Sequence, residues 1–287
     1  MRCACLLWLI AGCGFSSPSG LADDPGSPSG PGDPGAPVGP GGGSSAPSQC
    51  DASNPSPLLC VAFGGTSLVS DLATPVHQLL EHINVRPLPS FALPITGFVV
   101  QTAGAFGLGS QLRFRESPDL DVNNLTIDLW ISPDGGLATS DPSLLLDNNG
   151  EYFAAYNSDG SVRCGVAGTS LDSNAKVAVG TWHHVACTYG MVDRTLKVYV
   201  DGDLSGCKMA SAIPHGGKDG VAVGASYDPD PRPLQPNFQQ HFAGSLGHLH
   251  VYGIELTADQ ICHAAGRTGG CSQSCPGSGE GGVNQEG

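Results

Sequence analysis

The sequence predicts an all-β protein, an antiparallel sandwich that follows a long segment without regular structure. Between residues 58 and 261, short alternating or apolar runs recur at about ten-residue intervals, and Gly, Pro, Asn and Asp separate them. This is the pattern of an antiparallel sandwich or barrel. Helix is expected only at 76–83 and at 257–264, where Thr257 followed by Gln260 has the spacing of a capping box.

Single strands follow from the period-two pattern of each run. The run 125–132 places four apolar residues on one face and Asp128 and Trp130 on the other. The segment 143–166 is expected to form three strands, because its Asn-Gly and Asp-Gly pairs are strong hairpin turns. Further strands are expected at 58–63, 111–116, 183–190, 195–206, 220–226 and 245–253.

Composition divides the chain into segments. Residues 14–49 are almost entirely Gly, Pro, Ser, Ala and Asp. A segment so poor in large apolar residues cannot offset the entropy lost on ordering. We therefore expect a tether at 13–49, a β-sandwich at 50–275 and a disordered tail at 276–287.

The N-terminus, residues 1–12, has the features of a secretory signal. One positive charge precedes an apolar stretch that ends in small residues. Its end, Ile10-Ala11-Gly12-Cys13, resembles the bacterial lipobox, in which a signal peptidase cuts before the cysteine and the cysteine receives a lipid. The resemblance implies lipidation of Cys13 and a place at the bacterial cell surface or outer membrane. An ordinary cleaved signal, and secretion, is the alternative.

The charge of the chain excludes two classes of partner. The formal net charge is −14, with 12 Lys and Arg against 26 Asp and Glu, and no basic run occurs. Binding to nucleic acid or to anionic lipid is therefore not expected. No later apolar run approaches the roughly 20 residues of a spanning helix. Contact with a membrane is expected only through the lipid anchor.

Eight of the 11 cysteines remain once Cys3, Cys5 and Cys13 are set aside. An even number in an exported chain indicates disulfides, although the sequence does not determine the pairs. Cys164 and Cys187 lie in neighbouring predicted strands and could bridge them, and Cys271 and Cys275 could form a local clasp. The eight candidates are Cys50, Cys60, Cys164, Cys187, Cys207, Cys262, Cys271 and Cys275.

Six phrases in a fixed order resemble the laminin-G-like domains of the concanavalin A-like lectin and glucanase superfamily. The resemblance implies a jelly-roll sandwich that acts as a surface or secreted binding module. Gly247 stands where the family usually has an acidic residue, and residues 64–104 do not match. The phrases are AFGLGSQLRF (105–114), LTIDLWISP (125–133), GTWHHVACTY (180–189), LKVYVDGDL (196–204), VAVGAS (221–226) and FAGSLGHLHVYGIELTADQI (242–261).

Catalysis is not expected from the sequence. Several relatives with this architecture are glycosidases, and retaining glycosidases hold two carboxylates about 5 Å apart across the sugar bond. Here the Glu residues of the sandwich are isolated from one another, and Asp128 stands alone on its strand. Asp128 and Glu151 are the carboxylates whose mutation would reveal such an activity. The Gly-x-Ser-x-Gly and His-Glu-x-x-His motifs are both absent from the sequence.

Two sets of candidate site residues come from strands and loops. A glycan or an extracellular protein would contact the loops at one rim or a sheet face, where aromatic rings stack on sugars. The candidates for this are Trp130, Tyr227, Asp228 and Asp230. Ca²⁺ is the one candidate cofactor, bound through loop oxygens; turn formation is the alternative role of these residues. The candidate ligands are Asp147, Asn149, Asp201 and Asp203.

The histidines give a second metal hypothesis. His248 and His250 share one face of their predicted strand, and with His241 they could supply three nitrogens to a metal. The alternative, which the family resemblance favours, is that all three are polar residues at the surface. Of His183 and His184, one is expected to be exposed and the other to be packed by the neighbouring Trp182, itself expected to be a core or sheet-bridging residue.

Three functions remain open at this point. The first is a binding module for a glycan or an extracellular protein. The second is a structural or assembly component of the cell envelope, and the third is an enzyme that acts on polysaccharides. The first is preferred, because the residues that catalysis requires are missing from the sequence.

Overall fold

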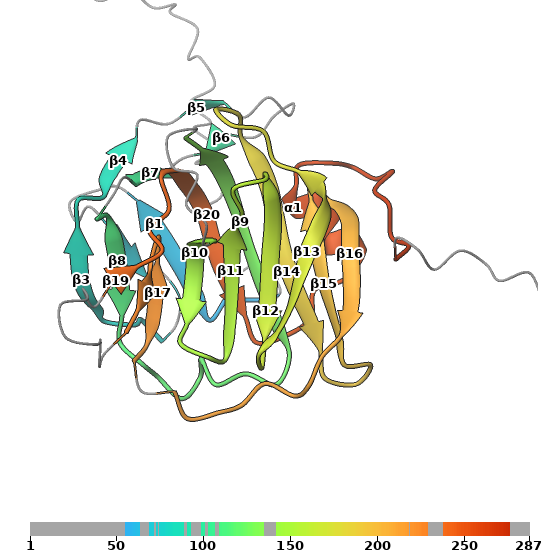
Figure 1. Cartoon of the computed structure of the whole chain (residues 1–287), viewed down its shortest axis with the longest axis horizontal. Coiled ribbons are helices and arrows are strands. Elements are labelled where there is room, and N and C mark those ends of the chain that lie inside the picture. Colours follow the sequence, from blue (N-terminus) through green and yellow to red (C-terminus); the bar gives the residue numbers. More distant parts are fainter. Residues whose placement is uncertain are drawn as a thin grey trace, which may run out of the picture. The chain divides into compact units, whose positions relative to one another are not determined.

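The computed structural model describes residues 55–63, 69–71, 73, 75–88, 91–92, 99–100, 103–106, 109–134, 142–217, 219–228 and 238–275. Within these residues, two antiparallel sheets pack face to face. We call the sheet that contains β9 and β14 sheet A and the sheet that contains β10 and β11 sheet B; sheet B lies in front in Figure 1. The all-β sandwich is therefore confirmed. The predicted signal with Cys13, the tether and the tail lie outside the described residues.

Sheet A holds the strands of the most regular phrases of the sequence. Its order is β16–β15–β14–β9–β20–β1–β2, and β7 pairs with β20 and β4 with β7. The bounds are β1 (Leu59–Phe63), β2 (Val69–Asp71), β4 (Arg86–Leu88), β7 (Ala103–Phe106), β9 (Leu125–Pro133), β14 (His183–Gly190), β15 (Thr195–Val200), β16 (Asp203–Met209) and β20 (Gly244–Tyr252).

Sheet B has the order β13–β12–β11–β10–β17–β8–β3. Its strands are β3 (Leu79–Ile83), β8 (Gln111–Phe114), β10 (Ser143–Asn148), β11 (Tyr152–Tyr156), β12 (Ser161–Val166), β13 (Thr169–Lys176) and β17 (Val221–Val223). Two small ribbons pair β5 (Phe91–Ala92) with β6 (Val99–Val100), and β18 (Ser226–Tyr227) with β19 (Phe238–Gln239). One helix, α1 (Ala258–Ala264), follows β20 among the described residues.

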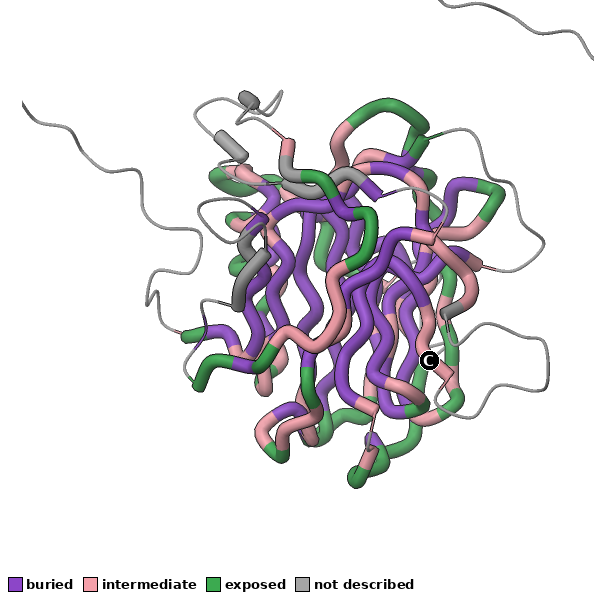
Figure 2. The backbone as a smooth tube through the Cα atoms, turned by 90° about the vertical axis from the view of Figure 1, so that its left-hand side faces the viewer, coloured by how far each residue is buried: buried purple, intermediate pink, exposed green. Residues whose placement is uncertain are grey.

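The core lies between the sheets, and β9 shows how the sequence builds it. Leu125, Ile127, Leu129 and Ile131 are fully buried and belong to the main apolar cluster, as their alternation predicts. Buried residues follow the strands of both sheets, whereas exposed residues gather in the connecting loops (Figure 2). The other face of β9 is also buried, so the outer face of sheet A is covered as well.

Turn chemistry explains the hairpins. Gly150 and Gly160 have φ angles of 91° and 86°, which glycine adopts without strain, and they connect β10, β11 and β12 as predicted. At the turn between β15 and β16, Asp201 and Gly202 both have positive φ. A Cβ on Gly202 would lie 2.9 Å from the sulfur of Cys271, so this glycine also admits the C-terminal segment.

The helix predicted at 257–264 is confirmed, and the helix predicted at 76–83 is wrong. Residues 79–83 form β3, which pairs with β8 at the edge of sheet B. A short apolar run fits either structure on periodicity, and here the available partner strand decides. β13 is missing from the predictions because its polar sequence, TSLDSNAK, has no apolar run.

Three disulfides join described residues. Cys164 on β12 bonds Cys187 on β14, so the predicted pair forms, but it links sheet B to sheet A and not neighbouring strands. The predicted clasp between the last two cysteines is wrong, because Cys271 bonds Cys262 of α1 and Cys275 bonds Cys207 of β16. The physical reason is that the C-terminal segment lies along sheet A, where these partners are closer.

The remaining cysteine candidates lie at the start of the domain. Cys60 is disulfide-bonded, and Cys50 lies outside the described residues. Several disulfides indicate an extracellular protein, since the cytoplasm keeps thiols reduced. None of the helices in the described part of the chain has the length and apolar character needed to cross a lipid bilayer.

Removing the inter-sheet disulfide should lower stability. With a sequence separation of 23, changing Cys164 and Cys187 to Ala together should reduce the free energy of unfolding by about 3 kcal/mol, because the unfolded chain gains entropy. The pair Cys262 and Cys271, at a separation of 9, is the control and should cost roughly 1 kcal/mol less. Denaturant unfolding measures both, and an equal or reversed order would contradict the assignment.

Candidate functional site

α1 and the segment before it cover part of the outer face of sheet A. This packing is apolar and joins three strands to the helix. The buried residues that form it are Ala186 on β14, Tyr199 on β15, Leu204 on β16, and Leu256 and Ile261 from the α1 region. The helix is thus held at a fixed place on the sheet.

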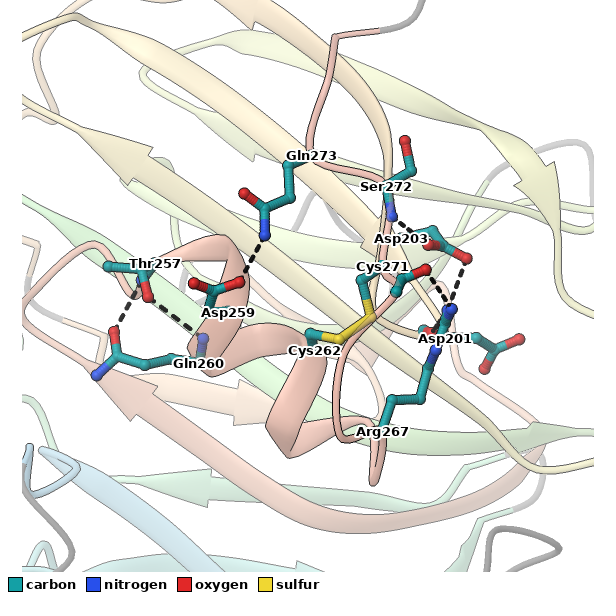
Figure 3. Close-up of a disulfide and its surroundings, with 11 residues drawn as sticks. Asp201, Asp203, Thr257, Asp259, Gln260, Cys262, Arg267, Cys271, Ser272 and Gln273 are labelled. Atoms are coloured by element: carbon teal, nitrogen blue, oxygen red, sulfur yellow. Dashed lines mark hydrogen bonds and ion pairs between the residues drawn. A yellow bond between two sulfur atoms is a disulfide. The ribbon is translucent and has the colours of Figure 1, made fainter.

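Polar contacts fix both ends of this segment (Figure 3). At the start of α1, the Gln260 amide N–H donates to Thr257 Oγ1 at 3.2 Å, and the Thr257 N–H donates to Gln260 Oε1 at 2.8 Å. The predicted capping box is therefore present. Beyond the helix, the Arg267 guanidinium donates to Asp203 Oδ2 at 2.8 Å, and the Ser272 N–H donates to the other oxygen of Asp203 at 2.5 Å.

A groove of about 460 Å³ lies beside α1, and we call it the α1 groove. Half-buried Tyr252, at the end of β20, lies in its wall, and exposed Asp259, Gln260 and His263 provide polar groups. An aromatic ring on an apolar wall with a few polar groups nearby is the usual composition of a small-molecule site. The full lining is Pro55, Tyr252, Leu256, Asp259, Gln260, His263 and Ala264.

A second groove of about 320 Å³ shares Leu256 with the first, and we call it the Lys197 groove. The Lys197 ammonium lies 2.6 Å from Glu255 Oε1 and 3.5 Å from Asp193 Oδ2. Burial alone would lower the pKa of Lys197, but the hydrogen bond to Glu255 and its charge raise it. The lysine therefore stays charged, and two carboxylates neutralise it.

Behind Tyr252 lies a buried group of ionisable side chains that sequence reasoning missed. Asp128 accepts hydrogen bonds from His184 Nε2 at 2.6 Å and from His250 Nδ1 at 3.2 Å. Burial alone would raise the pKa of Asp128, but the two imidazoles hold it far below its usual range. The ring of His250 lies 5.9 Å from that of Tyr252, so this group supports the wall of the α1 groove.

The prediction that the three histidines of the C-terminal strand region are surface residues is wrong for His250, which is 7% exposed. His248 is half-buried, and burial together with the nearby charge of His250 lowers its pKa to about 4. His241 lies apart, 3.3 Å from the Ser110 carbonyl oxygen. Throughout the described residues, no group of three or more His, Cys, Asp or Glu is arranged to hold a metal.

The two histidines of β14 also differ from expectation. His184 is fully buried, but the aromatic ring packed against it is that of Trp130, at 5.4 Å, and not that of Trp182. His183 Nδ1 donates to Asp201 Oδ2 at 2.8 Å, and His183 is half-buried, not exposed. Trp182 is half-buried as well and lies just before β14, where the sequence predicted a core or sheet-bridging residue.

The predicted ligand-binding residues that the structure describes do not all lie together. Trp130 is 1% exposed, because the outer face of sheet A is covered, and it cannot stack on a ligand. Tyr227 lies on the sheet B side, with the Arg113 guanidinium 4.2 Å above its ring. Asp228 is half-buried next to it, and Asp230 lies outside the described residues.

The predicted calcium ligands are not brought together either. Asp147 accepts from Ser226 Oγ at 2.7 Å, and burial raises its pKa, while Asn149 donates to Asp219 at 2.5 Å. Asp147 lies near the end of β10 in sheet B, and Asn149 lies in the turn that follows it. Asp201 and Asp203 belong to the β15–β16 turn in sheet A, where histidine, arginine and backbone donors occupy their carboxylates.

An acidic cluster that the sequence did not reveal lies near the β10–β11 turn. Glu151 is 3% exposed and accepts from the Gly217 N–H at 2.8 Å. Burial raises its pKa to about 7, and the nearby carboxylates of Asp121 and Glu116 add to the effect. Glu151 lies 30 residues after Asp121 and 35 after Glu116 in the sequence, so no local motif could have found the cluster. Glu151 can therefore hold a proton near neutral pH.

The family comparison confirms the fold, and the matched residues include β20 and most of α1, which lie beside the groove. The model of the concanavalin A-like lectin/glucanases superfamily matches residues 106–262. The chain belongs to this superfamily. Among curated proteins, the rat sushi, von Willebrand factor type A, EGF and pentraxin domain-containing protein 1 is 31% identical over 101 residues, and its mouse counterpart over 86. These matches cover 34% and 29% of the chain and about 2% of each relative.

Among solved structures, receptor-binding domains of toxins share the fold of this superfamily member. The binding domain of Paraclostridial mosquitocidal protein 1 has a TM-score of 0.55 at 13% identity, over 73% of the chain and 51% of that domain. The ligand-binding domain of botulinum neurotoxin serotype D, in complex with N-acetylneuraminic acid, has a TM-score of 0.53 at 11% identity. That match covers 73% of the chain and 50% of the toxin domain.

Glu151 should make stability depend on pH. Its folded-state pKa lies above its unfolded value, so the stability linked to its proton is full below about pH 4.5 and is lost as pH rises towards 7. Glu151→Gln keeps the shape, removes the charge and lets an amide donate to Asp121. Urea unfolding should show the variant to be more stable than wild type at about pH 8, by about 1 kcal/mol, with little difference at about pH 5. A variant less stable than wild type at the higher pH would contradict this.

Proposed function

We propose that the chain is a glycan-binding module and that the α1 groove is its binding site. The observation that carries the proposal is the combination of the Tyr252 ring with Asp259, Gln260 and His263 around one groove. Sugars present apolar C–H faces, which stack on aromatic rings, and hydroxyl groups, which bind carboxylate, amide and imidazole groups. The volume lies within the usual range of ligand sites, about 300–1,000 Å³.

The comparisons support this class of ligand. The superfamily is named after lectins as well as glucanases. The structures of two similar toxin domains were solved in complex with sialic-acid ligands. The chain corresponds to about half of each of these toxin domains. Their ligands therefore suggest a glycan for this chain and do not locate its site.

We also propose that the module binds without hydrolysing. The α1 groove contains one carboxylate, that of Asp259, whereas glycoside hydrolysis needs two. Asp128 is buried between two imidazoles. Glu151 is buried, accepts from the Gly217 N–H and does not line the α1 groove. Release of reducing ends from a polysaccharide panel, abolished in Glu151→Gln, would refute this.

The binding prediction compares two tyrosines. On a glycan array and in calorimetry with the best glycan, Tyr252→Ala should weaken binding by about tenfold, the loss of one aromatic stacking contact. Tyr227→Ala, on the other sheet, is the matched control and should bind as wild type does. His263→Ala removes an exposed lining residue and should weaken binding without affecting the melting temperature.

Three results would contradict the proposal. The first is an array on which wild type binds no glycan, and the second is an equal loss in both tyrosine variants. The third is unchanged binding in His263→Ala together with a folded Tyr252→Ala that binds normally. Thermal unfolding of each variant separates a lost contact from a lost fold.

We further propose that a lipid on Cys13 attaches the module to the bacterial surface, with residues 14–49 as the tether. The support is the sequence Ile10-Ala11-Gly12-Cys13 at the end of an apolar run. In a bacterial host, the wild-type protein should fractionate with membranes and carry the mass of a diacylglycerol, whereas Cys13→Ser should be soluble. Equal amounts of both proteins in the soluble fraction would exclude the anchor.

A further inference from the structure

We infer that the α1 groove selects glycans with free amino groups, of the glucosamine type, over sialylated or uronic-acid glycans. This inference rests on the proposed glycan-binding function and names its ligand class. It differs from what the sialic-acid complexes of the toxin neighbours suggest. The charges around the two grooves carry it.

The first step is the carboxylate in the groove. Asp259 lies in the first turn of α1, is exposed and lines the groove. Gln273 Nε2 donates to its Oδ1 at 2.5 Å, and this contact holds the carboxylate in place (Figure 3). The described residues donate a hydrogen bond to Oδ1 and none to Oδ2. A protonated amino group, with three N–H donors, matches this second oxygen.

The lysine near the groove is already paired with acidic side chains. Lys197 stands against two carboxylates, those of Glu255 and Asp193. A Cβ on Gly190 would lie within 3 Å of both acids, so the absence of a side chain there admits the second carboxylate. Lys197 and its two carboxylate partners together carry a net negative charge, so the lysine offers no free positive charge to a ligand.

The other cation near α1 is engaged as well. Arg267 donates to Asp203 Oδ2 at 2.8 Å and to the carbonyl oxygens of Asp201 and Gly270 at 3.1 and 2.8 Å. These bonds hold the C-terminal segment, so the guanidinium cannot turn to a ligand without breaking them. Among the described residues around α1, an anionic sugar would thus meet carboxylates without an available lysine or arginine.

The net charge of the whole chain acts in the same direction. At a formal net charge of −14, the protein attracts cationic ligands and repels anionic ones over a Debye length. This general attraction alone would favour amino sugars at any surface site. The specific part of the preference must therefore come from Asp259, and a variant can separate the two parts.

Three oligosaccharide probes test the selection by calorimetry on the purified protein. They are a glucosamine tetramer, the same tetramer fully N-acetylated, and sialyllactose, at a pH that keeps the amino groups protonated. Wild type should bind the amino tetramer about fivefold more tightly than the acetylated one, which is the effect of one exposed ion pair. Sialyllactose should bind most weakly, and the preference should shrink with added salt.

Two charge-matched variants give the decisive comparison. Asp259→Asn should bring the two tetramers to nearly equal affinity, chiefly by weakening the binding of the amino tetramer. Asp134→Asn is the control. Asp134 is exposed and follows the end of β9 that pairs with Gly244, whereas Tyr252 pairs with Thr126 near the other end of β9. It removes the same net charge and should keep the preference.

The outcomes separate the two proposals. Tighter binding of sialyllactose, equal binding of the two tetramers by wild type, or the same loss in both variants would overturn the selection by charge, and the glycan-binding function would stand. Failure of wild type to bind any of the three probes would also overturn the selection, and failure to bind any glycan on the array would refute the proposed function itself. His263→Ala should preserve the amino preference, and its loss there would assign the selection to the imidazole and overturn the role of Asp259.

Discussion

β9 is buried on both faces, and the remaining structure depends on this constraint. Its inner face, Leu125 to Ile131 in alternation, fills the space between the sheets. Its outer face carries Asp128 and Trp130, which need partners because they are also cut off from water. His184 and His250 on the two neighbouring strands satisfy Asp128, and β20, the strand of His250, leads to the turn and the helix that form the α1 groove. The need of buried Asp128 for hydrogen-bond partners thus fixes the strand that leads into the α1 groove.

The C-terminal segment turns that covered sheet face into a site. It is tied down by two disulfides, Cys262 to Cys271 and Cys207 to Cys275, and by the hydrogen bonds of Arg267 and Ser272 to Asp203. Seven helical residues alone would not be stable in water. Covalent and polar links replace the stability that length would have provided, and they keep Asp259 and Tyr252 at a constant distance across the groove.

Charge is unevenly used in this chain. Its few cations serve structure: Arg163 pairs with Asp172 on sheet B, Lys197 with Glu255, and Arg267 with Asp203. Acids outnumber them and remain at the grooves and at the cluster around Glu151. A binding surface built from the remainder is acidic, which is why ligand charge is the property by which this member of the superfamily can differ from its sialic-acid-binding structural neighbours.

The sequence by itself determined the sandwich, most strands of both sheets, the hairpin turns and the capped helix, because period-two alternation, Asn-Gly and Asp-Gly pairs and the Thr257–Gln260 spacing are local signals. It did not distinguish strand from helix at residues 79–83, where only a partner strand decides. It also misplaced Trp130 and His250, since alternation tells which face a residue occupies and not whether that face is covered. The tertiary structure decided the disulfide partners, the Asp128 group and the acidic cluster, because each joins residues that are separate in sequence. The residues of the α1 groove lie close together at 252–264, apart from Pro55. There the tertiary structure decided only the cavity, because the groove depends on how α1 packs against sheet A and not on the local sequence.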